Sequence, residues 1–288
     1  MTKHIEEGEN MDSNKFLSNN IFKATLVGLL VVIVNLIPLE KILGITLGDL
    51  GVMPTIYLIP MFFVYSLIAL VFSKMKNNLN LEKKGAFVVI FSFLFVINVL
   101  LTSIEGNFYL SNFPFIFTLI YGFTLALLIT LSISYLWKQD DNPVNVKEEI
   151  RLYFSSRSIF SWIWKSIVVL FLFYVFIMIL GAITYPLTGH YVENGIFKMP
   201  TMLELFSITM LRSIFYLLVT LPFIIFWKSS QKSLFLYLSL INILIYPVLG
   251  DGFAYFWPVM YRLIDGIVLA THAILMSWLY TTILKKGT

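Results

Sequence analysis

Long apolar runs separated by short polar segments dominate this sequence. A helix needs about 20 mostly apolar residues to cross the hydrocarbon core of a membrane. Because the apolar text within each run is continuous rather than alternating, the pattern predicts membrane-spanning helices and not a β-barrel. Eight such runs are present: Ile21–Leu39, Thr55–Phe72, Gly85–Thr102, Phe113–Trp137, Trp162–Tyr185, Met202–Phe226, Leu234–Leu249 and Phe256–Leu284. The seventh run is the shortest, so a complete span and a partly re-entrant segment both remain open for it.

Composition supports the same fold class. The chain of 288 residues is 59% hydrophobic and 12% charged, whereas soluble domains carry about 25% charged residues. A soluble protein of this length could not bury so much apolar surface. We therefore expect an all-α integral membrane protein whose solvent is the lipid bilayer.

Basic residues gather in alternate polar segments, which predicts the topology. The other segments contain only Lys41 and Lys198 among more numerous acidic residues. The positive-inside rule places the basic segments, and with them both termini, in the cytoplasm of a multi-pass cell-membrane protein. The basic set consists of Lys74, Lys76, Lys83, Lys84, Lys138, Lys147, Arg151, Arg157, Lys165, Lys228, Lys232, Lys285 and Lys286.

An internal repeat is visible in the apolar text. Ile97-Asn98, Pro114 and Gly122 recur 144 positions later as Ile241-Asn242, Pro258 and Gly266. Since each unit has four helices, the chain returns to its starting side and the two repeats are parallel. The predicted organisation is a cytoplasmic tail (1–20), a first four-helix repeat (21–137), a linker (138–161) and a second four-helix repeat with a short tail (162–288).

The cytoplasmic linker, Lys138–Ser161, is the longest polar stretch. It opens with a helix-start signature around Asp140 and continues with acidic and then apolar residues, including Ile150 and Phe154. Two interpretations stay open, an amphipathic helix on the membrane surface and a solvated connection between the halves. In either form the linker is the predicted contact surface for a protein partner.

Ionisable residues inside spans are costly and often functional, and those assigned to spans lie in the second repeat. Helical geometry places Arg262, Asp265 and His272 on one face and allows, by depth, the pairs Glu204–Arg262 and Arg212–Asp265. One interpretation is that these pairs hold two helices together. The other is an outward-open polar cavity that binds an anion. The candidate binding residues are Arg212, Arg262, Asp265, His272 and Glu204.

In the cavity hypothesis the two arginines bind the anion, because guanidinium groups suit carboxylate and phosphate oxygens. Asp265 is their counter-ion and His272 lies at the floor. The leading functional hypothesis is therefore a permease or binding component for a small anionic solute approached from outside.

Two other function classes remain as alternatives. One is an integral-membrane enzyme acting on a lipid or lipid-linked group through an outer carboxylate, Asp49, Glu105 or Asp251. The other is a non-catalytic partner or sensor subunit. The sequence contains no catalytic motif, no cysteine, no set of metal ligands and no cofactor signature. Its basic residues sort by membrane side rather than into one patch, so we expect no nucleic-acid binding.

Overall fold

Helices make up nearly all of the structure. The computed structural model describes residues 3–38, 41–42, 44, 53–110, 113–138, 143–193, 198, 200–255 and 257–284. Within these ranges the only β-type pairing is an isolated bridge between Leu79 and Trp227. The elements are α1 (Lys3–Asn35), η2 (Thr55–Tyr57), α3 (Leu58–Asn78), α4 (Lys83–Leu94), η3 (Phe95–Leu101), α5 (Thr102–Tyr109), α6 (Phe115–Leu136), α7 (Val146–Ser155), α8 (Ile159–Glu193), α9 (Met202–Phe226), α10 (Gln231–Ile243), η4 (Leu244–Asp251) and α11 (Val259–Ile283). The predicted all-α class is confirmed.

Seven helical segments in the described chain are long and apolar enough to cross a membrane. They are Thr55–Asn78, Lys83–Tyr109, Phe115–Leu136, Ile159–Tyr191, Met202–Phe226, Gln231–Gly250 and Val259–Ile283. The shortest predicted run reaches spanning length because α10 continues into the π-helix η4. The apolar part of α1 is shorter, Asn19–Asn35. The chain is thus a multi-pass membrane protein.

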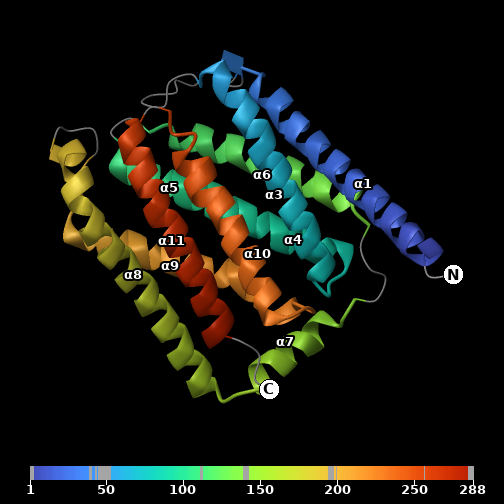
Figure 1. Cartoon of the computed structure of the whole chain (residues 1–288). Helices are drawn as coiled ribbons and strands as arrows, with labels where there is room; N and C mark the ends of the chain where they lie inside the picture. Colours follow the sequence, from blue (N-terminus) through green and yellow to red (C-terminus); the bar gives the residue numbers. More distant parts are fainter. Residues whose placement is uncertain are drawn as a thin grey trace.

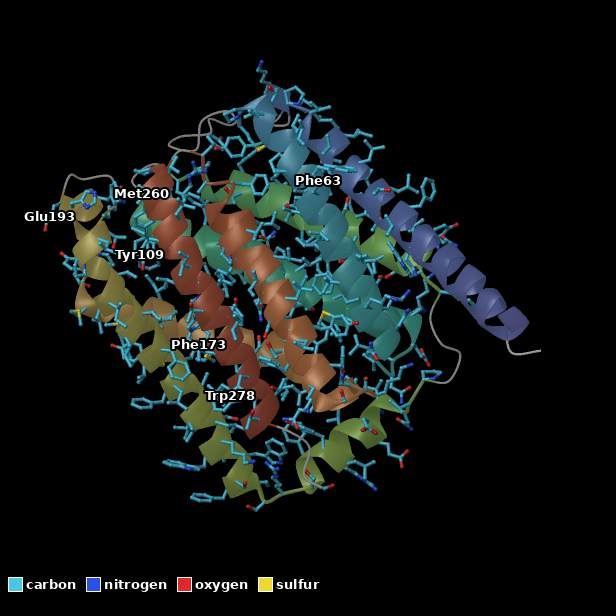
Figure 2. All side chains as sticks on the ribbon, in the orientation of Figure 1. Phe63, Tyr109, Phe173, Glu193, Met260 and Trp278 are labelled. Carbon is cyan, nitrogen blue, oxygen red and sulfur yellow. The ribbon has the colours of Figure 1, made fainter. Side chains whose placement is uncertain are left out.

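The outer surface of the bundle matches a lipid environment. Large apolar side chains such as Phe63, Met260 and Trp278 are 59%, 59% and 52% exposed (Figure 2). On α8, Phe171 and Ile183 are also exposed. Apolar groups in these positions would be unfavourable in water, and they are satisfied when hydrocarbon surrounds the helices.

The ends of the bundle differ in character. The last turns of α11 lie beside α7 in the lower part of the view, and α1 begins at the right edge (Figure 1). By the charge pattern the end of the bundle at α7 is the predicted cytoplasmic end, and we call it the inner end. Lys76, counted above as a loop cation, is instead buried in the last turn of α3. Its Nζ donates to the carbonyl oxygens of Trp137 (2.5 Å) and Ser134 (3.4 Å). A cation there satisfies the end of α6 and its dipole.

Helices of the two halves begin and pack at corresponding positions. Starting residues Leu58 of α3 and Met202 of α9 are 144 positions apart, as are Phe115 of α6 and Val259 of α11. A π-helix interrupts the third helix of each half, as η3 and η4. α3 packs against α10 and η4, and α9 packs against α4 and η3.

The two halves also meet through their backbones at the inner end. The segment after α3 runs antiparallel to the segment after α9 at the Leu79–Trp227 bridge. The Asn80 N–H donates to the Phe226 carbonyl (2.9 Å), and the Lys228 N–H donates to the Asn78 carbonyl (3.0 Å). Each half therefore contributes the same loop to the contact.

The linker contains a short helix, α7, that is packed on the bundle. Asn145 caps its start by accepting from the backbone N–H groups of Lys147 and Glu148. Residues 139–142, on which most of the predicted start signature falls, lie outside the described residues. Tyr153 is fully buried, and its hydroxyl donates to the Leu284 carbonyl at 2.6 Å. Burial raises the pKa of the Tyr153 phenol, which keeps that hydroxyl a donor.

Candidate functional site

An ion pair inside the bundle connects the two halves. Nη1 of Arg212, on α9, lies 3.0 Å from Oε1 of Glu105, on α5. Both side chains are largely buried, at 12% and 20% exposed. Counting about 1.5 Å per residue from Met202 places Arg212 about 15 Å from the start of its helix. The pair is therefore deep enough to lie in the low-dielectric part of the protein.

The carboxylate beside Arg212 is not the predicted one. Glu105 was expected in an outer loop, and Asp265 was expected to pair with Arg212. In the structure the third helix of the first half does not end near Thr102, because the π-helix η3 continues directly into α5. The continuation carries Glu105 into the bundle. The conclusion that the charged set is confined to the second half was wrong for the same reason.

Aromatic rings surround the Arg212 side chain. Its guanidinium lies 4.3 Å from the ring centroid of Tyr246, on η4. The rings of Tyr246 and Tyr216 stack with centroids 5.6 Å apart, and the Phe173 ring of α8 lies 5.5 Å from that of Tyr216. A guanidinium over an aromatic face is attracted by the ring quadrupole, more strongly where water is excluded. The rings thus help to hold Arg212 in place.

Several polar atoms around this pair have no hydrogen-bond partner among the described residues. They include Nε of Arg212, Oε1 of Glu105, Nε2 of His272, the Tyr280 hydroxyl and, one helical turn before Tyr246, Oδ1 of Asn242. A buried donor or acceptor without a partner costs about 1–3 kcal/mol, and more for a charged group. Such atoms are normally satisfied by protein, ordered water or a ligand. The cluster therefore has unused capacity to bind polar molecules.

His272 lies at the side of the cluster. It is 4% exposed, its ring meets that of Phe173 edge-on at 4.6 Å, and it hydrogen-bonds to the Phe173 backbone. It is also within electrostatic range of Arg212. Figure 2 shows Phe173 between α8 and α11. His272 therefore lies on the α8 side of the cluster.

Asp265 faces the same region from α11. Tyr109, at the end of α5, is within electrostatic range of Glu105, Arg212 and Asp265 together. Two acidic groups and one arginine thus surround a single tyrosine. We call Arg212, Glu105, Asp265, Tyr109, Tyr216, Tyr246, His272, Tyr280 and Asn242 the polar cluster.

The other two predicted residues have local structural partners. Oε2 of Glu204 accepts from the backbone N–H of Thr201 at 2.7 Å, while the Thr201 hydroxyl accepts from the Glu204 N–H. This capping box explains Glu204 as a helix-start residue. Nη1 of Arg262 donates to the Tyr57 hydroxyl (3.3 Å) and the Gly252 carbonyl (3.2 Å). The predicted Glu204–Arg262 pair is therefore wrong.

Six members of the cluster were absent from the predicted site: Glu105, Tyr109, Tyr216, Tyr246, Tyr280 and Asn242. Tyr216 follows Arg212 by four residues, which puts both on one helix face, and this spacing could have identified it. Glu105 and Tyr246 are placed by the π-helical segments, whose wider turns shift the face that a residue occupies. Ordinary helical periodicity does not anticipate that shift.

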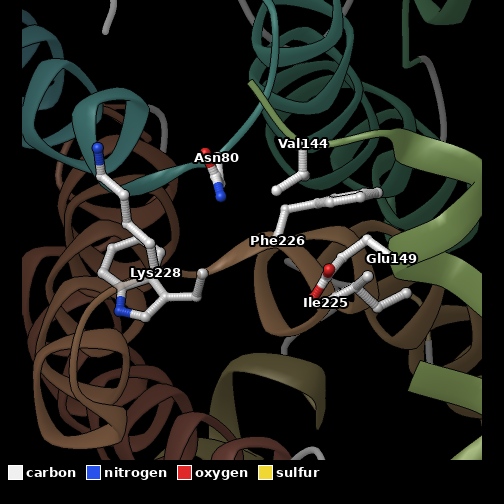
Figure 3. Close-up of a pocket in the computed structure, with 7 residues that line it drawn as sticks. Asn80, Val144, Glu149, Ile225, Phe226 and Lys228 are labelled. Carbon is white, nitrogen blue, oxygen red and sulfur yellow. The ribbon is translucent and has the colours of Figure 1, made fainter. Parts of the chain in front are cut away.

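A hollow lies at the inner end, away from the polar cluster in sequence and contacts. It has a volume of about 100 Å³ and lies between the start of α7 and the bridged loops (Figure 3). The Val144 N–H donates to the Asn80 carbonyl at 3.3 Å along its wall. Its lining residues are Asn80, Val144, Glu149, Ile225, Phe226, Trp227 and Lys228. The hollow shows that α7 stands partly off the bundle near its start.

In the described part of the chain, no group of three or more His, Cys, Asp or Glu side chains is placed so that it could hold a metal ion.

Comparison with known proteins finds no matching family model, no matching curated protein and no matching solved structure. Fold and composition thus define the class, a multi-pass α-helical membrane protein. The residues that bear on its function are those of the polar cluster.

Proposed function

We propose that this protein is a permease or binding component that receives a small anionic solute at Arg212 from the outer side of the cell membrane. One observation carries the proposal. Arg212 uses Nη1 for Glu105, while its Nε is buried and has no hydrogen-bond partner in the described chain. A charged donor left open at this depth is expensive unless water or a ligand completes it.

The chemistry of the open donor favours an anion with two neighbouring oxygens. The guanidinium presents its N–H groups in a planar fork that fits carboxylate or phosphate oxygens in a bidentate manner. Glu105 lies at Nη1 of Arg212. A solute oxygen that binds at Nε therefore either shares the guanidinium with the Glu105 carboxylate or displaces that carboxylate. The tyrosine hydroxyls of the cluster supply further donors. Asp265 and His272 border this site, whereas Glu204 is accounted for by its capping box. Arg262 bonds through Nη1 to Tyr57 and Gly252, and its Nε also has no partner in the described chain.

The architecture is also part of the proposal. We take the chain to be a duplicated four-helix unit, with α1 as the eighth span and both termini in the cytoplasm. The matching helix starts, the reciprocal packing of α3 and α9, and the paired inner loops support this interpretation. Parallel repeats occur in transporter folds, although a fold alone does not specify a function. The polar cluster lies where the second half meets α5 of the first.

The test is stabilisation of the purified protein by anions. The wild type in lipid nanodiscs is heated with sodium acetate, succinate, phosphate or sulfate, each compared with sodium chloride at equal ionic strength. An anion that binds the folded state at a hundredfold excess over its Kd adds about 2.7 kcal/mol of stability and raises the melting temperature. At least one of the four is expected to do so.

The variant Arg212→Lys separates the site from general salt effects. It keeps a cation beside Glu105 but loses the planar guanidinium with its Nε–H donor. The increase in melting temperature caused by the anion is therefore expected to disappear. Arg151→Lys on α7 is the matched control, because the same exchange at an exposed position should keep the full gain. The proposal fails if no anion stabilises the wild type, or if Arg212→Lys responds as the wild type does.

A further inference from the structure

The helix α7 carries an exposed apolar stripe at the inner end of the bundle. Val146, Ile150 and Phe154 are 41%, 37% and 43% exposed. Since they are spaced by four residues, they occupy an arc of about 80° on the helix. Tyr153 borders this arc and is fully buried. The stripe therefore lies next to the face of α7 that packs on the bundle, and its side chains point along the side of the helix and not into the bundle.

Basic residues follow the stripe on the side away from the bundle. At about 100° per residue, Lys147 and Arg151 lie about 20° and 60° beyond Phe154, and both are exposed. An apolar arc edged by Lys and Arg is the pattern of helices that lie in a membrane surface, with apolar groups toward the acyl chains and cations among the headgroups. The inner leaflet of cell membranes is the anionic one that such cations prefer.

The stripe continues into a surface that already faces lipid. Only Ser156, Arg157 and Ser158 separate α7 from α8. The first residues of α8, Ile159 and Phe160, are each 78% exposed. Among the seven spans of the described chain, α8 has the smallest buried share, 11%. The end of α7 is thus held within a few residues of the membrane boundary.

From this geometry we propose that α7 lies in the cytoplasmic leaflet, with Val146, Ile150 and Phe154 among the upper acyl chains and with Lys147 and Arg151 binding anionic lipid headgroups. The bundle fixes its orientation through Tyr153, whose hydroxyl bonds to Leu284 and whose ring lies 4.4 Å from that of Trp162. The linker between the halves is then an anionic-lipid contact. This proposal is independent of what the polar cluster binds.

The chain contains no cysteine, so single spin labels can be placed without altering other residues. Labels are attached at Ile150→Cys and Phe154→Cys, and Leu152→Cys is the matched control. Leu152 is 44% exposed but lies about 160° from Phe154 around the helix. The full-length variants are placed in nanodiscs of phosphatidylcholine, with or without phosphatidylglycerol. Collision rates with oxygen and with a water-soluble nickel chelate are then measured.

The labels at 150 and 154 are expected to have an oxygen-to-nickel ratio severalfold higher than the label at 152. Phosphatidylglycerol should widen that difference, and the double change Lys147→Gln with Arg151→Gln should remove the widening. Equal ratios at all three positions would overturn the proposal. Labels at 150 and 154 that are shielded from both reagents would also overturn it, because protein would then cover the stripe. If Phe154→Cys does not fold, Val146→Cys tests the same stripe.

Discussion

The two halves of the bundle contain two different groups of buried polar residues. In the first half the Tyr121 hydroxyl donates to Oδ1 of Asn35, whose Nδ2 donates to the Val31 carbonyl at 2.8 Å. Tyr65 is hydrogen-bonded to Asn98. These groups are neutral and lie on four different helical elements, α1, α3, η3 and α6, so they hold the half together.

The polar cluster, most of which lies in the second half, contains charge and open polar atoms instead. Arg212 pairs with Glu105 of the first half, and several atoms near it lack partners in the described chain. A satisfied neutral network mainly specifies packing, whereas open donors at depth are where a ligand gains most. Two similar helical frames therefore bury different kinds of polar group, and the binding site proposed above depends on that difference.

The largest expected effect comes from breaking the ion pair on one side. Arg212→Met leaves the Glu105 carboxylate buried without its cation, and Glu105→Met does the same to the arginine. Each single change should cost about 3–5 kcal/mol of unfolding free energy, whereas the double change should be close to neutral. Unfolding in detergent measures all three. Single variants as stable as the wild type would show that the pair is well hydrated, and the contrast between the halves would then weaken.

Removing one tyrosine hydroxyl from each half sharpens the comparison. Tyr121→Phe leaves Oδ1 of Asn35 without its donor and should cost about 1–3 kcal/mol. Tyr280→Phe removes a buried hydroxyl that has no partner among the described residues, so its cost should be near zero. Both changes delete one oxygen from a tyrosine on the fourth helix of a half. Equal losses in the two unfolding experiments would contradict the difference between the satisfied Tyr121–Asn35 pair and the open Tyr280 hydroxyl.

Much of the frame was predictable because it follows from hydrophobic runs. Seven of the eight predicted runs correspond to helices of spanning length, since a lipid solvent forces each run to satisfy its own backbone. The docking of α7 on the bundle was not predictable, because it depends on one buried side chain, Tyr153. A single buried position in a polar linker does not produce a recognisable hydrophobic pattern. Ion-pair partners were less predictable still. The depth of each residue in the membrane, calculated for ideal α-helices, favoured Asp265 as the partner of Arg212. That calculation did not include the π-helix before Glu105, which extends the helix and brings Glu105 to Arg212.

The smallest expected effect concerns the hydrogen bonds at the C-terminal end of the last helix in each half, α6 and α11. The end of α6 is satisfied by Lys76 from within the same half, whereas the end of α11 relies partly on Tyr153 from the linker. Tyr153→Phe removes one hydrogen bond to the Leu284 carbonyl and should cost about 1 kcal/mol. Amide hydrogen exchange should rise in α7 and in the last turn of α11, but not in α6. Tyr135→Phe, at a tyrosine 86% exposed, is the control and should change neither. Faster exchange throughout the bundle after Tyr153→Phe would show that the linker stabilises both halves, and the difference between their inner ends would disappear.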